Sequence, residues 1–168
     1  QPYDAHFNMD RSPRQQPAVR SVSIVGPFDP TGIAVTPSRE RIFSCQPAGP
    51  EDEPGCARAI LSRLGRLAYR RPLEATELDR LLGFYSDGSL DGGFEAGVEL
   101  ALRFLLASPQ FIFRFESEPA DIAAGEVYPL ADLDLASRLS FFLWSSGPDD
   151  ALLAAAEQGQ LSDPEELA

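Results

Sequence analysis

The sequence predicts a mainly α-helical bundle around one central apolar helix at about residues 93–107, with a short extended or β segment near the N-terminus. In the central stretch the charged residues Glu95, Glu99 and Arg103 recur every four positions and form one narrow stripe, and the rest is apolar or small. A helix that is apolar on most of its circumference must be covered by neighbours. Three further runs with helical apolar spacing supply those neighbours.

Composition limits the classes of function. The chain has 168 residues, enough for one sizeable core, and a formal net charge of -12. This charge excludes nucleic-acid binding as a main task. The central apolar stretch is too short and too charged to span a membrane, so we expect no membrane span. The chain begins without Met and stops within a helix that Pro164 starts, so we expect a piece of a longer protein.

The N-terminal part, residues 1–41, is polar and rich in Pro, and it predicts an arm and a linker. Within it, Val19–Val25 alternates apolar and polar residues and predicts a short strand that Gly26 and Pro27 close. One strand is not stable alone, so its partners lie upstream or fold over the helices. Residues 28–41 have turn chemistry and predict a linker without helix.

Two cysteines, Cys45 and Cys56, bracket a loop rich in Pro, Gly and acidic residues. The ten-residue gap excludes a CxxC redox pair, and a metal site would need more ligands than the distant His6 supplies. We therefore predict a structural disulfide between Cys45 and Cys56. Such a bond implies an oxidising compartment.

The first predicted helix covers residues 54–71, with Ala57, Ile60, Leu61 and Leu64 facing inward. On another of its faces lies a basic stripe of Arg63, Arg66 and Arg70. This stripe is a solvated face that pairs with acidic residues, or alternatively a site for an anion.

The second predicted helix covers residues 74–85, and a Gly-rich segment at 86–93 follows it. Asp87, Ser89 and Asp91 match positions 1, 3 and 5 of a calcium loop, but the twelfth position is Val98 in place of Glu. The sequence therefore favours a helix–helix turn in which Asp91 caps the central helix, with calcium as the alternative.

After Pro109, three phenylalanines alternate with Ile112 and Arg114, and predict an extended segment or a short helical turn. Core packing is the expected role of Phe111, Phe113 and Phe115, with a cofactor pocket as the alternative. A loop at 117–128 precedes a helix at 129–145. Its expected inward residues are Leu133, Ala136, Leu139, Ser140, Phe142 and Leu143. A short Ala-rich helix at 150–158 follows, with Ser146 or Gly147 at its start.

Catalytic chemistry has few candidates here. The candidate acids are Glu116, Glu118, Asp132, Asp134, Asp149 and Asp150. Paired carboxylates hydrolyse glycosidic bonds only at a suitable separation across a cleft, and adjacent acids at a helix start are expected as caps. With one His, no nucleophile–base pair is expected, so we assign no catalytic, cofactor-binding or metal residue. Arg138 lies among apolar helix residues, which predicts a buried clamp onto a carboxylate or carbonyl.

Long motifs carry a family resemblance. The segments RIFSCQPAGPEDEPGCARAILSRLGRLAYRRPL and GGFEAGVELALRFLLASPQFIFRFE resemble domain of unknown function 1595. The segment YPLADLDLASRLSFFLWSSGPDDALLAAAEQGQLSDP resembles the start of domain of unknown function 1592. The resemblance implies a layout of 1–41 as the tail of an upstream β domain, 42–116 as one helical domain, and 117–168 as the truncated start of a second.

The resemblance also implies a setting, that of planctomycete-type exported multidomain proteins, many of which carry c-type cytochrome and carbohydrate-binding domains. It implies an extracytoplasmic location, with other domains of the same polypeptide and carbohydrate as partners. The segment has no CxxCH motif, so we expect no haem and no other cofactor in it. The sequence favours a structural or interaction module; the alternative is part of an extracytoplasmic oxidoreductase or polysaccharide-degrading enzyme.

Overall fold

The computed structural model divides the chain into two units, residues 1–34 and residues 35–168. The described residues are 22–23, 25–26, 28, 35–116, 118–119, 121–123 and 125–162. The extended segment predicted around Val19–Val25 cannot be assigned, since most of it lies outside these residues. His6 and the helix start at Pro164 also lie outside them.

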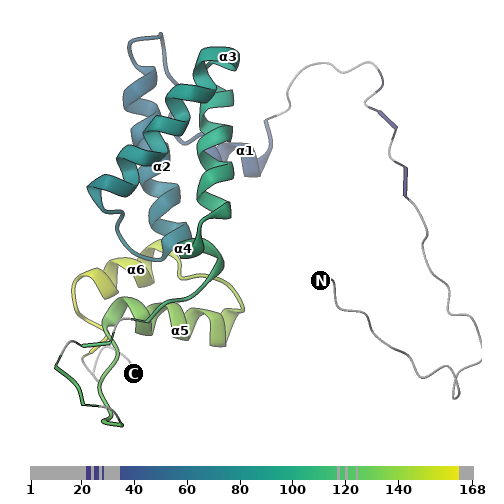
Figure 1. Ribbon diagram of the computed structural model, residues 1–168. Coiled ribbons are helices and arrows are strands. Elements are labelled where there is room, and N and C mark those ends of the chain that lie inside the picture. The colour runs from purple at the N-terminus through teal and green to yellow at the C-terminus, as the bar shows by residue number, and fades with distance from the viewer. Residues whose placement is uncertain are drawn as a thin grey trace, which may run out of the picture. The chain divides into compact units, whose positions relative to one another are not determined.

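The described part of the second unit is mainly α-helical, as the sequence predicts, and contains six helices (Figure 1). The helix α2 (Glu53–Tyr69) lies beside the long helix α3 (Ala75–Ala107), and the helices α5 (Asp132–Trp144) and α6 (Asp150–Glu157) form a second pair. The short helix α1 (Pro37–Ile42) lies beside α3, and the short helix α4 (Pro109–Ile112) lies at the end of the α2–α3 group that is nearer to α5 and α6. No described helix is long and apolar enough to cross a membrane.

The helix α3 consists of two antiparallel arms that join at Gly93. This residue has φ 73° and ψ -167°, a conformation that glycine adopts without the steric cost of a Cβ. The second arm is the predicted central helix. The first arm is longer than predicted, because residues 86–92 are helical and form no loop. Asp91 therefore lies inside a helix and does not cap one.

The two arms and α2 enclose the main core. Its buried side chains come from α2 (Ala57, Ile60, Leu61 and Tyr69), from the first arm of α3 (Leu81 and Tyr85) and from the second arm (Val98, Ala101 and Leu105). The inward face predicted for α2 is confirmed. Burying one Leu or Ile side chain stabilises a fold by about 1.5–3 kcal/mol, so this cluster is the main source of stability in the unit.

The arms of α3 approach most closely at Gly97. A Cβ built on Gly97 would lie 2.6 Å from the backbone oxygen of Tyr85 and 2.7 Å from its ring. Backbone cannot give way as a flexible side chain can, so this position needs a residue without a side chain. Gly83, in the first arm, has no atom within 4 Å of such a Cβ and is exposed.

We expect Gly97→Ala to lower the free energy of unfolding by about 1–3 kcal/mol, since the added methyl group forces the arms apart. Gly83→Ala is the matched control and should raise it by about 0.5–1 kcal/mol, because alanine is the better helix former. Urea unfolding followed by circular dichroism measures both. Equal effects of the two substitutions would contradict the close contact.

The segment predicted as a linker ends in the helix α1. The Thr36 hydroxyl accepts a hydrogen bond from the Arg39 N–H at 3.2 Å, and Pro37 occupies the first turn, a favourable helix start. Arg39 pairs with Glu95 on the second arm of α3, and the ring of Phe43 lies 6.3 Å from that of Phe94. These contacts attach α1 to α3.

The predicted disulfide is present. Cys45, which follows α1, is bonded to Cys56 in the first turns of α2, and their Cα atoms are 5.3 Å apart. Cys56 is buried, and Cys45 packs against the main core. The bond therefore fixes the chain after α1 onto the start of α2.

The double substitution Cys45→Ser and Cys56→Ser should lower the free energy of unfolding by about 2–3 kcal/mol, since the unfolded chain gains the freedom of the opened loop. Urea unfolding of wild type with and without dithiothreitol provides the control. The reductant should destabilise wild type by a similar amount and leave the double variant unchanged. A stable wild type in reductant would refute this role of the disulfide.

The α5–α6 pair has a smaller core, formed by Ala136, Ala156 and Leu161 with partly buried leucines around them. Ala136 and Ser140 of α5 are buried as predicted. Phe142 and Leu143 were expected to face inward, but they are 83% and 64% exposed. The α6 helix has only eight residues and packs against the first half of α5, so it leaves the end of α5 uncovered.

Candidate functional site

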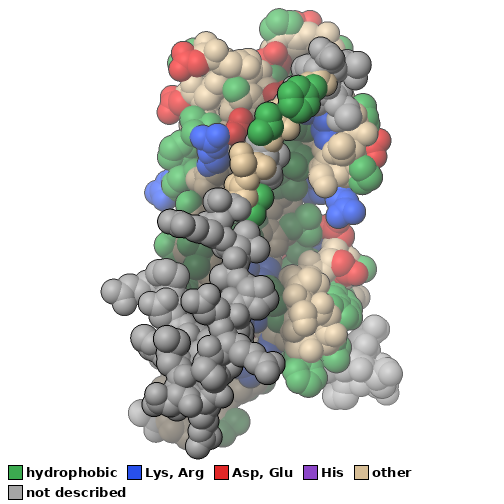
Figure 2. Space-filling view, turned by 90° about the vertical axis from the view of Figure 1, so that its right-hand side faces the viewer, with side chains coloured by type: hydrophobic (Ala, Val, Ile, Leu, Met, Phe, Trp, Pro, Cys, Tyr) green, Lys and Arg blue, Asp and Glu red, His purple; other side chains and the backbone are tan. Residues whose placement is uncertain are grey.

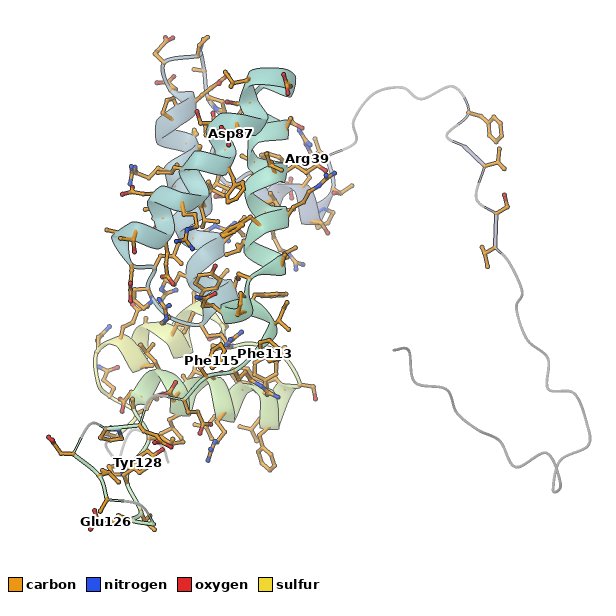
Figure 3. All side chains as sticks on the ribbon, viewed as in Figure 1. Arg39, Asp87, Phe113, Phe115, Glu126 and Tyr128 are labelled. Carbon is orange, nitrogen blue, oxygen red and sulfur yellow. A yellow bond between two sulfur atoms is a disulfide. The ribbon has the colours of Figure 1, made fainter. Side chains whose placement is uncertain are left out.

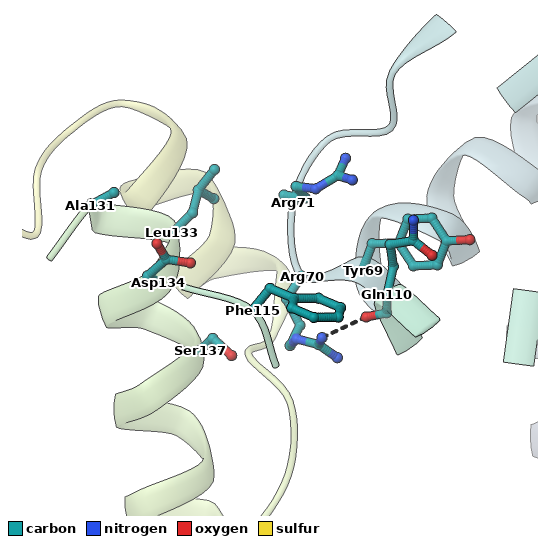
Figure 4. A pocket seen from close by; sticks show the side chains of 9 residues that line it. All are labelled: Tyr69, Arg70, Arg71, Gln110, Phe115, Ala131, Leu133, Asp134 and Ser137. Atoms are coloured by element: carbon teal, nitrogen blue, oxygen red, sulfur yellow. Dashed lines mark hydrogen bonds between the residues drawn. The ribbon is translucent and has the colours of Figure 1, made fainter. Parts of the chain in front are cut away.

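Three adjoining hollows lie at and beside the joint, which is the place where the end of α2 and the segment after α4 meet α5. The middle hollow has a volume of about 220 Å³ (Figure 4). It is lined by the end of α2 (Tyr69, Arg70 and Arg71), by Gln110 and Phe115, and by the start of α5 (Ala131, Leu133, Asp134 and Ser137). The hollow is therefore formed by residues from both helical groups.

The other two hollows adjoin the middle one. A hollow of about 380 Å³ shares Tyr69 and Gln110 with it and extends along α3. A hollow of about 340 Å³ shares Phe115, Asp134 and Ser137 with it and extends along α5. Since each outer hollow shares lining residues with the middle one, the three form a row across the joint.

Arg70 is the main polar contact inside the joint. It ends α2 in the left-handed conformation, with φ 59°. Its guanidinium donates to the carbonyl oxygens of Gln110 at 2.7 Å, Phe113 at 2.9 Å and Ala68 at 3.0 Å. Burial, and to a smaller extent the nearby charge of Arg114, lower the pKa of Arg70. Arg70 therefore holds the α4 segment against the end of α2 through backbone atoms.

The rest of the predicted basic stripe also binds oxygen atoms of the chain itself. Arg66 donates to Glu157 at 2.6 Å and to Asp150 at 2.8 Å, which joins α2 to α6. The hydrogen bond to Glu157 is the largest cause that raises the pKa of Arg66. Arg63 donates to the carbonyl oxygen of Arg41. The pairing interpretation is confirmed for Arg66, while Arg63 and Arg70 bind backbone carbonyls.

Two further arginine–carboxylate clamps lie beside the hollows. Arg138 donates two hydrogen bonds to Glu116, at 3.0 and 2.8 Å. The predicted clamp is thus present, but its arginine side chain is 61% exposed and not buried. Arg71 donates two hydrogen bonds to Glu77, at 2.9 and 2.7 Å, and the clamp lowers the pKa of that carboxyl.

Most candidate acids have structural contacts. Asp132 accepts from the N–H groups of Leu161 at 2.7 Å and Ser162 at 3.2 Å. Asp149, and not Ser146 or Gly147, caps α6 by accepting from the Leu152 N–H at 2.8 Å.

The other four candidate acids occupy different places. Asp150 and Glu116 are in the ion pairs already described, and Glu118 is exposed in the loop before α5. Asp134 lines two of the hollows. Among the six acids, Asp134 and Glu116 therefore lie in the row of hollows.

The residues of the calcium-loop alternative lie on the first arm of α3. Asp87, Ser89 and Asp91 have helical backbone, and the Ser89 hydroxyl donates to the Ser86 carbonyl at 2.9 Å (Figure 3 labels Asp87). A calcium loop directs alternate residues inward from a non-helical backbone. The described residues contain no group of three or more His, Cys, Asp or Glu side chains that could hold a metal ion.

The aromatic segment after Pro109 combines both structures that the sequence left open. Residues 109–112 form α4, and the chain is extended from Phe113 onward. The expectation of core packing is wrong for all three phenylalanines, since Phe111, Phe113 and Phe115 are 39%, 58% and 67% exposed, and the rings of Phe113 and Phe115 are adjacent (Figure 3). Phe115 instead forms a wall of two hollows. In the sequence, the alternation of aromatic and charged residues is the signal that identifies a segment with exposed aromatic side chains.

We expect Arg70→Ala to lower the free energy of unfolding by roughly 1–3 kcal/mol, since it removes a charged donor that binds three backbone carbonyls. Arg58→Ala is the matched control, because Arg58 is exposed and has one long ion pair, 3.9 Å from Asp79. Its effect should stay within about 0.5 kcal/mol. Urea unfolding compares the two, and equal small effects would show that Arg70 does not stabilise the joint.

Comparison with known proteins gives two family matches. Residues 56–116 match the model of PSD5, described as Protein of unknown function (DUF1595), and residues 130–168 match that of PSD4, described as Protein of unknown function (DUF1592). No curated protein and no solved structure matches the chain. The resemblance drawn from the sequence motifs is thereby confirmed: the chain carries a DUF1595 segment followed by a DUF1592 segment.

Proposed function

We propose that this chain is a structural and interaction module of an exported multidomain protein, and that it acts by docking other parts of that protein. One observation carries the proposal. Large apolar side chains are exposed beside the joint, on α4, on the segment after it and at the end of α5. They are Phe111, Ile112, Phe113, Phe115, Phe142, Leu143 and Trp144, and we call them the apolar surface.

The composition of the apolar surface supports binding of another protein surface. Phe and Trp are enriched at the centres of protein interfaces, where they bury much area with few rotatable bonds. On the face drawn in Figure 2, hydrophobic side chains lie at the surface among arginine and acidic side chains. Apolar groups surrounded by polar ones are typical of interaction sites.

The disulfide supports a location outside the cytoplasm, since such bonds persist in oxidising compartments. The family resemblance supports a multidomain setting that includes c-type cytochrome and carbohydrate-binding domains. Other domains of the same polypeptide, and carbohydrate bound by them, are therefore the proposed partners.

The alternative function, part of an extracytoplasmic oxidoreductase or polysaccharide-degrading enzyme, is favoured by no specific observation. Asp132 and Asp149 bind helix ends, and Asp150 and Glu116 bind arginines. A catalytic carboxylate must instead face the reacting bond. The docking module remains the function that the geometry supports best.

Photo-cross-linking tests the docking function. The photoreactive residue p-benzoylphenylalanine replaces Phe113 or Phe142 in the protein produced in its native cells, and mass spectrometry identifies the cross-linked peptide. We expect one defined peptide of the same polypeptide at both positions. Leu90 is the control position, because it is 82% exposed but lies on the first arm of α3. Products at positions 113 and 142 that do not exceed those at position 90 would refute docking at the apolar surface.

A further inference from the structure

The row of hollows has a charge opposite to that of the whole chain. Five arginines and three carboxylates line the three hollows, whereas the chain has a net charge of -12. The arginines are Arg70, Arg71, Arg80, Arg114 and Arg138, and the carboxylates are Glu77, Glu116 and Asp134. The joint is thus a positively charged strip on an acidic protein, and it favours an anionic partner.

Three of these arginines form no ion pair among the described residues. The described ion pairs use Arg71 and Arg138 but none of Arg70, Arg80 and Arg114. Arg114 lies over the ring of Phe141, 4.4 Å from its centre, and adds its charge to the surroundings of Arg70. These three arginines are spread along the row, with Arg80 at one end, Arg70 in the middle hollow and Arg114 at the other end.

The segment 113–116 begins with extended backbone at Phe113, whose φ is -105° and ψ 154°. The ring centres of Phe113 and Phe115 are 6.0 Å apart, while Arg114 and Glu116 contact α5. Within the described part of the chain, the N–H and C=O groups of residues 114–116 form no backbone hydrogen bond. Such groups are available to a second strand, which would place alternate side chains against the two phenylalanines.

We propose that the row of hollows binds an extended peptide segment with alternating acidic and apolar side chains, which pairs with the backbone of residues 114–116. Its apolar side chains pack on Phe113 and Phe115, and its carboxylates face Arg80 and Arg114. This inference rests on the proposed docking function and names the partner. Backbone pairing favours a peptide over an acidic polysaccharide, since a sugar chain has no matching row of donors and acceptors.

The test uses the whole chain and three fluorescein-labelled peptides of one apolar pattern, EVELEVE, QVQLQVQ and KVKLKVK, with fluorescence anisotropy as the readout. We expect binding of the acidic peptide only, with an affinity that falls as NaCl rises from 50 to 300 mM. Arg114→Glu and Arg80→Glu should each weaken binding at least tenfold. Arg103→Glu is the matched control, since Arg103 is exposed and lines none of the three hollows, and it should leave the affinity unchanged.

Other outcomes overturn the inference. Equal weakening by Arg103→Glu shows general charge attraction, and binding of oligogalacturonate in place of the acidic peptide shows a polysaccharide site. A urea unfolding curve for each variant verifies that it is folded, and Arg114→Gln provides a second, milder variant that should show the same direction of change. Cross-links at positions 113 and 142 without binding of the acidic peptide would refute this inference and leave the docking function standing.

Discussion

The fold depends on how closely the two arms of α3 approach each other. At Gly97 the second arm meets the backbone of Tyr85 with no side chain between them. This contact brings Tyr85 against Phe94, with ring centres 5.9 Å apart and edge to face, and places both in the core that α2 closes. A wider spacing of the arms would remove Tyr85 from that core and expose the face of α2 that packs against them.

The joint between the two helical groups is held by polar contacts, in contrast to the apolar packing of the α2–α3 core. Arg66 crosses the joint from α2 to α6, while Arg70 and Arg138 hold the segment that connects the two groups. Each of the three binds oxygen atoms with two N–H groups. The guanidinium suits this task because its donors lie in a rigid plane and remain charged at any ordinary pH. Such hydrogen bonds form only in a narrow range of directions and bury little apolar surface. Hollows therefore remain beside the joint.

Much of the fold could be predicted from the sequence because the helices have clear apolar periodicity. The inward face of α2, the central helix and the cysteine pair needed only local patterns. The length of the first arm of α3 could not be predicted, because residues 86–93 contain turn-forming residues whose helical state depends on packing against the second arm. Helix α1 was missed because its short capping signal at Thr36 lies in a polar stretch.

The candidate site was less predictable than the fold. The position of Arg138 among apolar residues predicted that it binds a carboxylate or a carbonyl. It did not predict that the arginine side chain is exposed. Phe142 and Leu143 have the periodicity of core residues, and only the short length of α6 shows that nothing described covers them. Which hollows exist depends on where α5 lies against the end of α2. The ion pairs of Arg66 on α2 with Asp150 and Glu157 on α6 contribute to that arrangement, and a residue pattern does not reveal such long-range pairs.

The disulfide also has a mechanical consequence. If tension acts on the chain ahead of α1, force passes from Cys45 through the sulfur bridge directly into α2, and the ten residues between the cysteines carry none of it. Only after the disulfide is reduced can those residues extend, and they then add roughly 35 Å of contour length to the chain under tension. The redox state of one bond would thereby set how far the chain ahead of α1 extends before the helical core bears load.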